Sequence, residues 1–551
     1  MDEAQSVTHP RTVPDWRLEA GSDLGFKPRV ALIWVALSAL FLAYQAWLLP
    51  VLTDWVSAAV DEGFVTYAAQ RIREGAWPHR DFFFLWTPGT PLLHAALESA
   101  GFSWVGERAA SLVASAGSGL LILGWARRWR LPLFERALLA ALLAVWSFSL
   151  WNIPYSSWYA VFLALLAMRV LPRSITAAAL LFGASFWFKQ NIGIPACLGA
   201  VLWLLQQRDR SAAARVSAIF LIALVLPLAA IGVFGGGFAL RQALNQIFIF
   251  PFHYASLMGT APASESFAAP LSSLGLWVLS LYFLRADSAS RSARLVQLGV
   301  VAYVGMYAMK SPESFLQAGF MLLSIVAWPL SLAIALTEKG GRARVLSFWL
   351  PGLGIFLQVF PRMDFQHFLF VFPLSALLLA HALARLHARY NWLPPFWARL
   401  PAFLLLLSGV ILQAGVVDVR LHGSRDSLGR ISSGAGQRLD EEVTAVWRFL
   451  KNEGLKEGDP ILVLPNAVAV YGWTGFRNPT PHPQFFPGYV DGYGDKQSAV
   501  LPSFRAAGGR FLVVQERSGL ETDVPQIWEE IQKNYREVKS FPEHFTVYAP
   551  R

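Results

Sequence analysis

The sequence is short of cysteine and of charged residues. Its single cysteine, Cys197, lies inside an apolar run, which excludes an intramolecular disulfide and a cysteine-based metal cluster. Charged residues make up 15% of the 551 residues, whereas a soluble protein carries about 25%. No HExxH, CxxC, EF-hand, glycine-rich nucleotide-binding or G-x-S-x-G pattern is present. We therefore expect neither a metal site nor a cofactor.

Hydrophobic residues, in contrast, make up 55% of the chain and gather in repeated long runs. The mean hydropathy is +0.43. These features are typical of a polytopic helical membrane protein. The formal net charge of +10 would suggest nucleic acid in a soluble protein, but a membrane protein collects Lys and Arg in its cytoplasmic loops. We expect a lipid bilayer as partner and no nucleic acid.

Run length and flanking charge predict about 13 spans. The first run is too long for a cleaved signal peptide, and residues 1–29 before it are expected to be a cytoplasmic tail. The expected spans are approximately 30–51, 107–126, 133–151, 155–171, 174–188, 191–206, 215–236, 270–284, 294–310, 314–337, 344–360, 366–386 and 397–417.

Positive charge orients these spans. With the N-terminus inside, the Arg-rich loops 127–132, 207–214, 285–293 and 338–343 are cytoplasmic, as the positive-inside rule requires. This register depends on reading 174–206 as two spans divided at Lys189. A single long helix there would place the later Arg-rich loops outside, so the sequence favours two.

The loop at 52–106 is expected on the outer face. Its stretch Pro88–Phe102 is apolar but short, which predicts a helix lying along the membrane interface. Residues 30–417 then form a transmembrane catalytic module, joined by a linker at 418–433 to an extracytoplasmic α/β domain at 434–551. In that domain the patterns predict helices at Leu439–Asn452 and Val524–Asn534, and strands at Ile461–Leu464, Phe511–Val514 and Phe545–Tyr548.

An acidic pair, Asp61–Glu62, follows the first span. An arbitrary pair of this kind is usually a solvated loop feature. Here the pair comes about ten residues after a span, and the pattern of Phe64–Glu74 places it near a helix N-terminus, which stabilises carboxylates. The surrounding loop is rich in aromatic residues and proline. These features favour an ordered site.

A second set of candidates is basic or polar, and the predicted topology brings it to the same outer face. A single Lys or Arg at a membrane boundary usually extends to the headgroups, and a lone His is as often a core residue. Together, cations beside a carboxylate could bind a phosphate carried by a lipid. The set comprises Arg80, Asp81, Lys189, Gln190, Arg241, His253, Tyr254, Lys310, Arg362 and His367.

Several short motifs in the first 130 residues belong together. After the first span the chain reads Asp61-Glu62, Tyr67-Ala68, Gly75-Ala76-Trp77-Pro78 and Thr87-Pro88-Gly89-Thr90-Pro91, and Arg108-Ala109 opens the second span. In these motifs the chain resembles the GT-C superfamily of membrane glycosyltransferases, and within it the bacterial relatives of protein O-mannosyltransferases and lipid A aminoarabinose transferases. The aminoarabinose and mannosyl transferases have Lys-Pro-Pro where this chain has Thr87-Pro88-Gly89. This departure leaves the donor and acceptor unidentified.

The resemblance implies a helical GT-C-like bundle in a bacterial cytoplasmic membrane that transfers a sugar from a polyprenyl-phosphate donor to a hydroxyl acceptor. It implies Asp61 as the general base, with Glu62 as its less suitable partner, and inversion at the sugar carbon. Lys189, Arg362 and His367 are the expected phosphate contacts, and Lys310 and Arg241 are weaker ones. Further substrate contacts are expected among Tyr67, Arg80, Asp81, Gln190, His253 and Tyr254.

Three alternatives remain at the level of sequence. A transporter or flippase of a lipid-linked sugar would commonly show inverted repeats, and none is visible. A non-catalytic scaffold of envelope assembly would leave the acidic pair unexplained. A transferase that uses a diphosphate-linked donor would differ only in its leaving lipid.

Overall fold

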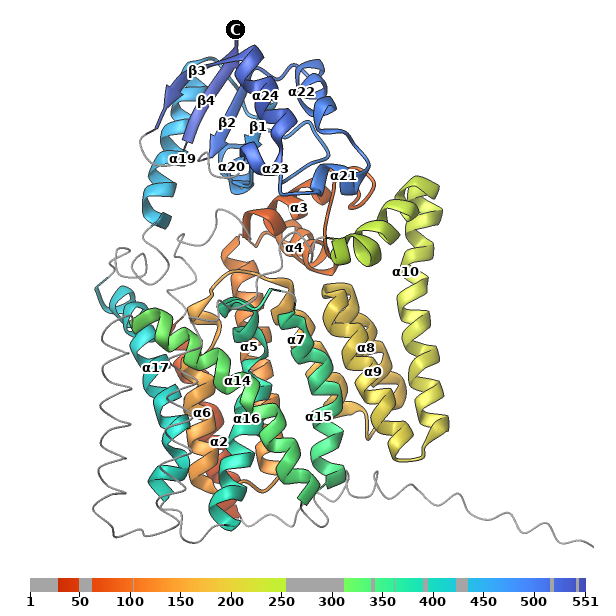
Figure 1. The fold of residues 1–551 in the computed structure, drawn as a ribbon, viewed down its shortest axis with the longest axis vertical. Helices are drawn as coiled ribbons and strands as arrows, with labels where there is room; N and C mark the ends of the chain where they lie inside the picture. Colours follow the sequence, from red (N-terminus) through yellow and green to blue (C-terminus); the bar gives the residue numbers. More distant parts are fainter. Residues whose placement is uncertain are drawn as a thin grey trace, which may run out of the picture.

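A computed structural model describes most of the chain (Figure 1). The described residues are 28–48, 62–102, 104–253, 312–337, 342–360, 362–389, 395–422, 435–515, 520–541 and 545–551. Three candidate residues, Asp61, Tyr254 and Lys310, lie outside them, as do the expected spans at 270–284 and 294–310.

Each remaining expected span coincides with a helix of the bundle. Within the described ranges, five helical stretches are long and apolar enough to cross a membrane, and others are shorter. The fold is therefore a mostly helical membrane bundle, while the total of about 13 spans stays a prediction. The bundle helices are α2 (Pro28–Trp47), α5 (Trp104–Arg128), α6 (Leu133–Val145), α7 (Ser156–Val170), α8 (Ile175–Phe188), α9 (Gln190–Gln206), α10 (Arg210–Leu244), α14 (Pro312–Thr337), α15 (Arg342–Phe356), α16 (Phe365–Arg389) and α17 (Pro395–His422).

The division at Lys189 is confirmed. Helix α8 ends at Phe188 and α9 begins at Gln190, because Lys189 between them has an extended backbone with φ −156° and ψ 111°. The two helices pack against each other. Gly193 allows this approach, since a Cβ there would lie 2.2 Å from the backbone N of Phe186.

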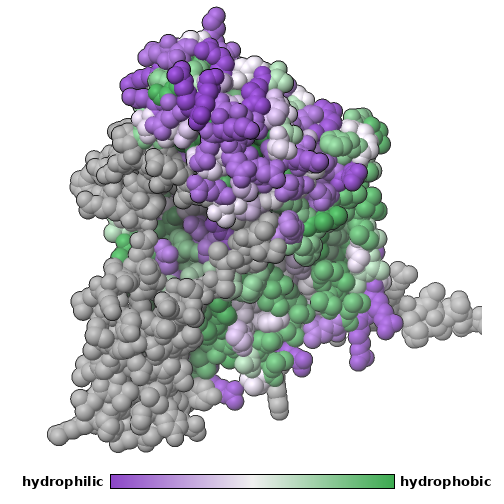
Figure 2. All heavy atoms as spheres, turned by 45° about the horizontal axis from the view of Figure 1, so that its top comes forward, coloured by the Kyte–Doolittle hydropathy of each residue, from purple (hydrophilic) through white to green (hydrophobic). Residues whose placement is uncertain are grey.

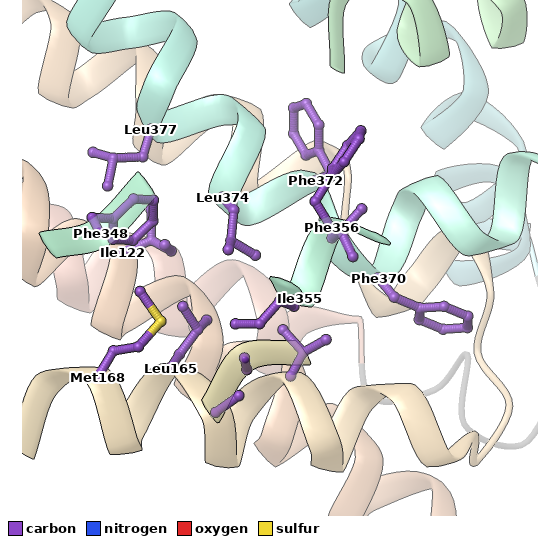
Figure 3. Close-up of a cluster of buried hydrophobic side chains, with 14 of the residues drawn as sticks. Ile122, Leu165, Met168, Phe348, Ile355, Phe356, Phe370, Phe372, Leu374 and Leu377 are labelled. Atoms are coloured by element: carbon purple, nitrogen blue, oxygen red, sulfur yellow. The ribbon is translucent and has the colours of Figure 1, made fainter. Parts of the chain in front are cut away.

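Helix α16 is central and α10 is peripheral. In the apolar stretch of α16, 94% of the residues are buried inside the protein, against 17% in the apolar stretch that contains α10. Figure 3 shows Leu374 and Leu377 of α16 beside Phe348 and Ile355 of α15. Phe370 points away from that cluster. The exposed apolar side chains of α10 are what a lipid-facing helix requires.

Two short helices lie between the bundle and the C-terminal domain (Figure 1): α3 (Gly63–Arg73) and α4 (Gly89–Ser99). Helix α4 rests on the end of α8, because Thr87 Oγ1 donates a 2.7 Å hydrogen bond to the Phe186 carbonyl. A Cβ on Gly89 would lie 2.3 Å from the carbonyl oxygen of Trp187. Both helices were predicted, and their contacts with the bundle hold the outer loop in place.

The C-terminal domain has a four-stranded sheet in the order β1-β2-β4-β3. Strand β1 (Ile461–Leu464) pairs in parallel with β2 (Phe511–Gln515), whereas β4 (Phe545–Pro550) is antiparallel to β2 and to β3 (Tyr535–Ser540). The predicted strands and helices are present. The edge strand β3 was not predicted, because its side chains are mostly exposed. The helices are α19 (Ala435–Asn452), α20 (Ala469–Thr474), α21 (Tyr489–Tyr493), α22 (Gln497–Ala506), α23 (Leu520–Asp523) and α24 (Pro525–Asn534).

This domain is docked on the outer loop and on the end of α10. Phe83 N donates to the Pro481 carbonyl at 2.8 Å, and Gln242 Nε2 donates to the Tyr493 carbonyl at 2.7 Å. A Cβ on Gly63 would lie 2.5 Å from Ala469 N, so α3 touches α20 directly. Figure 2 shows hydrophilic residues over the domain and hydrophobic residues over the bundle, which fits a domain outside the bilayer.

Candidate active site

Glu62 is tied to the bundle by Arg108. Arg108 Nε donates to Glu62 Oε1 at 2.7 Å and Nη2 donates to Oε2 at 2.6 Å, and both side chains are buried. A buried pair is stable only with geometry of this bidentate kind. Glu62 is therefore occupied by an ion pair. The prediction that Asp61, one residue earlier, is the base remains, and Asp61 lies outside the described residues.

A second buried carboxylate lies beside Arg108. Glu107 Oε2 accepts a 3.2 Å hydrogen bond from Thr66 of α3 and lies 3.3 Å from His94 Nδ1 of α4. His94 Nε2 is 3.1 Å from the Tyr159 hydroxyl of α7. These side chains join three elements to α5. Arg73 at the end of α3 pairs with Glu98 of α4, with Nη1 2.8 Å from Oε2. We call Glu62, Arg73, His94, Glu98, Glu107 and Arg108 the acidic layer.

Lys189 lies nearby on the same end of the bundle. It is only 3% exposed. Its Nζ donates to Ser157 Oγ at 2.7 Å and to Gln358 Oε1 at 3.2 Å, and it lies 4.9 Å from the centre of the Tyr155 ring. Neutral groups and an aromatic face therefore hold the ammonium in place.

Gln358 connects Lys189 to two more of the predicted residues. Its Nε2 donates to the His367 carbonyl at 2.9 Å, and His367 Nδ1 is 2.6 Å from Asp364 Oδ1. Arg362 Nε is 2.9 Å from Asp364 Oδ2. Burial disfavours the ionised form of Asp364, but the hydrogen bonds from His367 outweigh this and lower its pKa. We call Ser157, Lys189, Gln358, Arg362, Asp364 and His367 the lysine cluster.

Three helices begin at the lysine cluster. Helix α7 begins at Ser156, α9 at Gln190 and α16 at Phe365. A helix N-terminus carries a partial positive charge and attracts anions, whereas cations are disfavoured there. Asp364 caps α16 by accepting a bond from His367 N. A cationic side chain among three such ends makes this a place suited to a further anion.

Aromatic side chains connect the lysine cluster to the segment after the acidic pair. Tyr155 stacks on Phe370 with ring centres 5.1 Å apart and meets Trp86 edge-on at 5.1 Å. Trp86 in turn meets Phe64 of α3 at 5.5 Å. The acidic layer and the lysine cluster thus share α7 and one continuous aromatic wall.

The other predicted side chains in the outer loop make structural contacts. Tyr67 is buried against Tyr471 of α20, with ring centres 5.2 Å apart. Arg80 and Asp81 pair with each other at 2.7 Å and are partly exposed. Gln190 Nε2 donates to the carbonyls of Leu85 and Ile247. These residues fasten the loop, and their part in substrate binding stays a prediction.

Two predicted residues lie on the peripheral helix instead of in the lysine cluster. Arg241 and His253 are exposed on α10 and its continuation. The His253 ring meets Phe250 edge-on, with ring centres 6.1 Å apart. Their part in phosphate or substrate binding stays a prediction. Tyr254 and Lys310 lie outside the described ranges.

Sequence reasoning missed three members of the cluster as site residues. Ser157 is the second residue of α7, Gln358 lies in an apolar run, and Asp364 stands between Arg362 and His367. For Ser157 and Gln358 the available signal was a polar residue inside a predicted span, because such residues are costly there and usually functional. Among the described residues no group of His, Cys, Asp and Glu could hold a metal ion.

No family profile and no curated protein matches the chain. Among solved structures the chain is similar to the crystal structure of ArnT from Cupriavidus metallidurans bound to undecaprenyl phosphate, with a TM-score of 0.42 and 15% identity. The match covers 93% of this chain and 97% of that one. The TM-score and identity are too low to carry over a substrate or the role of a residue.

Proposed function

We propose that this protein is a membrane glycosyltransferase that moves a sugar from a polyprenyl-phosphate donor to a hydroxyl acceptor on the extracytoplasmic face. One observation carries the proposal: Lys189, His367 and Arg362 are linked through Gln358 and Asp364 beside three helix N-termini, at the end of the bundle where Glu62 also lies. The motif resemblance of residues 61–109 to GT-C glycosyltransferases supports it.

The lysine cluster suits a phosphate that is carried at the membrane surface. A phosphate is a compact anion, and charge-assisted bonds from Lys and Arg are the strongest that proteins offer it. Lys189 is already held by Ser157 and Gln358, so the binding of an anion costs little further side-chain conformational entropy. The relatives' lysine position is occupied here by Thr87, which is buried against Phe186. Lys189 supplies a cation three residues after Phe186.

The chemistry follows from these charges. The acceptor oxygen attacks the anomeric carbon, the bond from that carbon to the phosphate oxygen breaks, and the polyprenyl phosphate leaves with the electron pair. Asp61 takes the proton of the hydroxyl as it attacks, a contribution of about 10²–10⁴-fold. Cations around the phosphate stabilise the departing charge. A single in-line displacement inverts the anomeric carbon.

Binding and transfer are tested separately with two variants. Lys189→Gln should weaken the binding of undecaprenyl phosphate about tenfold or more, as measured by native mass spectrometry of the purified protein. Asp61→Asn should retain that binding and lose transfer about 10²–10⁴-fold. The matched control is Lys456→Gln in the C-terminal domain, where the lysine is exposed. Unchanged lipid binding by the Lys189 variant would remove the basis of the proposal.

The sugar and acceptor can be named in cells. A deletion strain should accumulate a polyprenyl-linked sugar and lack one glycan decoration. Mass analysis of the accumulated lipid also tells a monophosphate donor from a diphosphate donor. A strain with normal lipid-linked sugars and normal glycans would contradict the assignment.

A further inference from the structure

Two glutamines are buried at the end of α10 that meets the C-terminal domain. Gln242 is 8% exposed and Gln246 is fully buried. Gln246 lies in a π-helical turn, η4 (Asn245–Ile249), that directly follows α10. Polar residues in an apolar spanning stretch are costly, and π-helical turns are frequent at functional sites. No step of the proposed reaction uses either glutamine.

The two glutamines form a continuous hydrogen-bond chain between the C-terminal domain and the outer loop. Gln242 Nε2 donates to the Tyr493 carbonyl at 2.7 Å, and Gln246 Nε2 donates to Gln242 Oε1 at 3.2 Å. Gln246 Oε1 accepts a bond from Phe84 N at 3.1 Å and lies 2.8 Å from His79 Nδ1. We call Tyr493, Gln242, Gln246, Phe84 and His79 the amide latch.

Backbone groups at both ends of the amide latch decide the direction of its bonds. A carbonyl only accepts, so Gln242 presents Nε2 to Tyr493 and Oε1 to Gln246. A backbone N–H only donates, so Gln246 presents Oε1 to Phe84 and to His79. His79 Nδ1 therefore carries a hydrogen whatever the charge of the ring.

The other ring nitrogen of His79 has no acceptor for a second hydrogen. His79 is fully buried, and its Nε2 has no hydrogen-bond partner within the described ranges. An imidazolium would thus bury an N–H group and a charge that nothing compensates, whereas the neutral ring leaves only a lone pair unpaired. The latch fits the neutral ring and disfavours the protonated one.

Nearby charges do not change this conclusion. The elements that meet at the latch carry Arg71, Arg80, Asp81, Arg241, His482 and Asp495. Arg80 pairs with Asp81 at 2.7 Å, and His482 pairs with Asp495 at 2.8 Å. In the part of the chain that the structure describes, His79 belongs to no ion pair. No carboxylate is therefore placed to stabilise an imidazolium there.

The amide latch also holds one end of the aromatic wall that leads to the lysine cluster. The Phe84 ring stacks on Phe64 with ring centres 5.0 Å apart and meets Trp86 edge-on at 5.9 Å. Trp86 meets Tyr155 at 5.1 Å, and Lys189 Nζ lies 4.9 Å from the centre of the Tyr155 ring. A shift of the loop at Phe84 therefore moves side chains that contact the lysine cluster.

We propose that the amide latch positions the outer loop for the reaction and that a proton added to His79 releases it. His79 and Gln246 are then positioning residues, and their effect on transfer rests on the proposed function. His79 has a φ of 68°, a left-handed conformation that residues other than glycine rarely adopt. Such a backbone persists only where its surroundings hold it, so the loop relaxes once the latch opens.

The pH dependence has a definite sign. Burial lowers the pKa of His79 from 6.5 to about 4, and the bond with Gln246 opposes this only in part. The open loop therefore binds a proton that the closed loop excludes. The latch is fully stable above about pH 6.5 and loses stability as the pH falls from there through about 4. Its opening equilibrium constant rises by up to about tenfold per pH unit in this range.

The test is hydrogen exchange of the segment 77–86 in micelles, with His79→Asn and the parent protein compared at each pH between about 4.5 and about 7.5. Asparagine tolerates a positive φ, and its amide can donate to Gln246 without titrating. The two proteins should protect the segment equally at the upper pH. In acid the parent should lose protection relative to the variant by up to about tenfold per pH unit, while α16 stays protected in both.

A matched control and a transfer assay complete the test. His253→Asn removes an exposed histidine at the same end of α10 and should keep the acid dependence of the parent. Exchange needs no sugar donor, so its result is independent of the proposed function. In a transfer assay His79→Asn should retain the activity that the parent loses in acid. Loss of protection in acid with undiminished transfer would refute the positioning role.

Two exchange results would overturn the latch. One is an equal loss of protection in His79→Asn and the parent. The other is loss of the acid dependence in His482→Asn alone, which would place the proton in the C-terminal domain. If His79→Asn does not fold, Gln246→Leu decides, because it removes the acceptor of both His79 and Phe84. That variant should protect the segment less than the parent at every pH, and equal protection contradicts the proposal.

Discussion

The acidic layer and the lysine cluster lie at the same end of the bundle and share helix α7, yet their charges are arranged in opposite ways. In the acidic layer each guanidinium contacts a carboxylate, because Arg73 pairs with Glu98 and Arg108 pairs with Glu62. In the lysine cluster a buried ammonium is held by Ser157 and Gln358 among helix N-termini. Balanced charges hold a structure together, whereas an excess of positive charge at a prepared site attracts an anion.

This comparison assigns stability to the acidic layer and binding to the lysine cluster. The two parts differ in what a substitution should do. Changes in the acidic layer should lower the free energy of unfolding, and changes in the lysine cluster should lower ligand affinity instead. Three substitutions put this difference to the test, from the largest expected loss of stability to the smallest.

Arg108→Gln should cause the largest loss of stability. It leaves Glu62 buried without its bidentate cation, and breaking such a pair costs about 3–5 kcal/mol. Thermal and denaturant unfolding in detergent measure the change. The control is Arg505→Gln, because Arg505 pairs with Glu530 at 2.8 Å nearer the surface and should cost less than about 1 kcal/mol. Equal stability of the two variants would refute a structural role for the Glu62–Arg108 pair.

Gly63→Ala should cause an intermediate loss. The new Cβ would lie 2.5 Å from Ala469 N and 2.8 Å from Ala469 Cα, so α3 or α20 must move. Overpacking of this kind costs about 1–3 kcal/mol. Because Gly63 follows the acidic pair, transfer should fall as well. Gly124→Ala in α5 meets no neighbour within 4 Å and serves as the control. Full activity of Gly63→Ala would show that α20 does not fix the loop.

Lys189→Gln should change stability least, by less than about 1 kcal/mol, and can raise it, because the substitution removes a cation from helix N-termini. The Gln amide can still reach Ser157 or Gln358. The same protein sample is used for unfolding and for lipid binding. A loss of stability as large as that of Arg108→Gln, with unchanged lipid binding, would reverse the comparison between the two regions.

Much of the fold could be predicted from the sequence because it depends on local patterns. Helix positions follow from apolar runs. The division at Lys189 follows from the charged residue that interrupts the apolar run at 174–206 and from the positive-inside rule, which a single helix there would violate. Buried strands of the C-terminal domain were found by their apolar runs. Strand β3 was not, since an edge strand with mostly exposed side chains lacks that pattern.

For the candidate site, too, the sequence predicted individual residues but not their long-range contacts. Sequence alone identified Lys189, Arg362 and His367 as polar residues in costly places, and the acidic pair by its motif. It gave no basis for pairing Glu62 with Arg108, which is 46 residues away, or Lys189 with Gln358, which is 169 residues away. Apolar periodicity states which face of a helix is buried, but it does not state which helix covers that face.

By itself, then, the sequence determined the membrane bundle, the outer loop and the sheet domain, because each follows from hydropathy and from the local spacing of residues. Only the tertiary structure decided that Glu62 is held by Arg108, that Glu98 pairs with Arg73, and that Lys189 lies at the start of α7. The physical reason is that buried charges are stable only with partners in contact, and those partners come from distant segments that packing brings together.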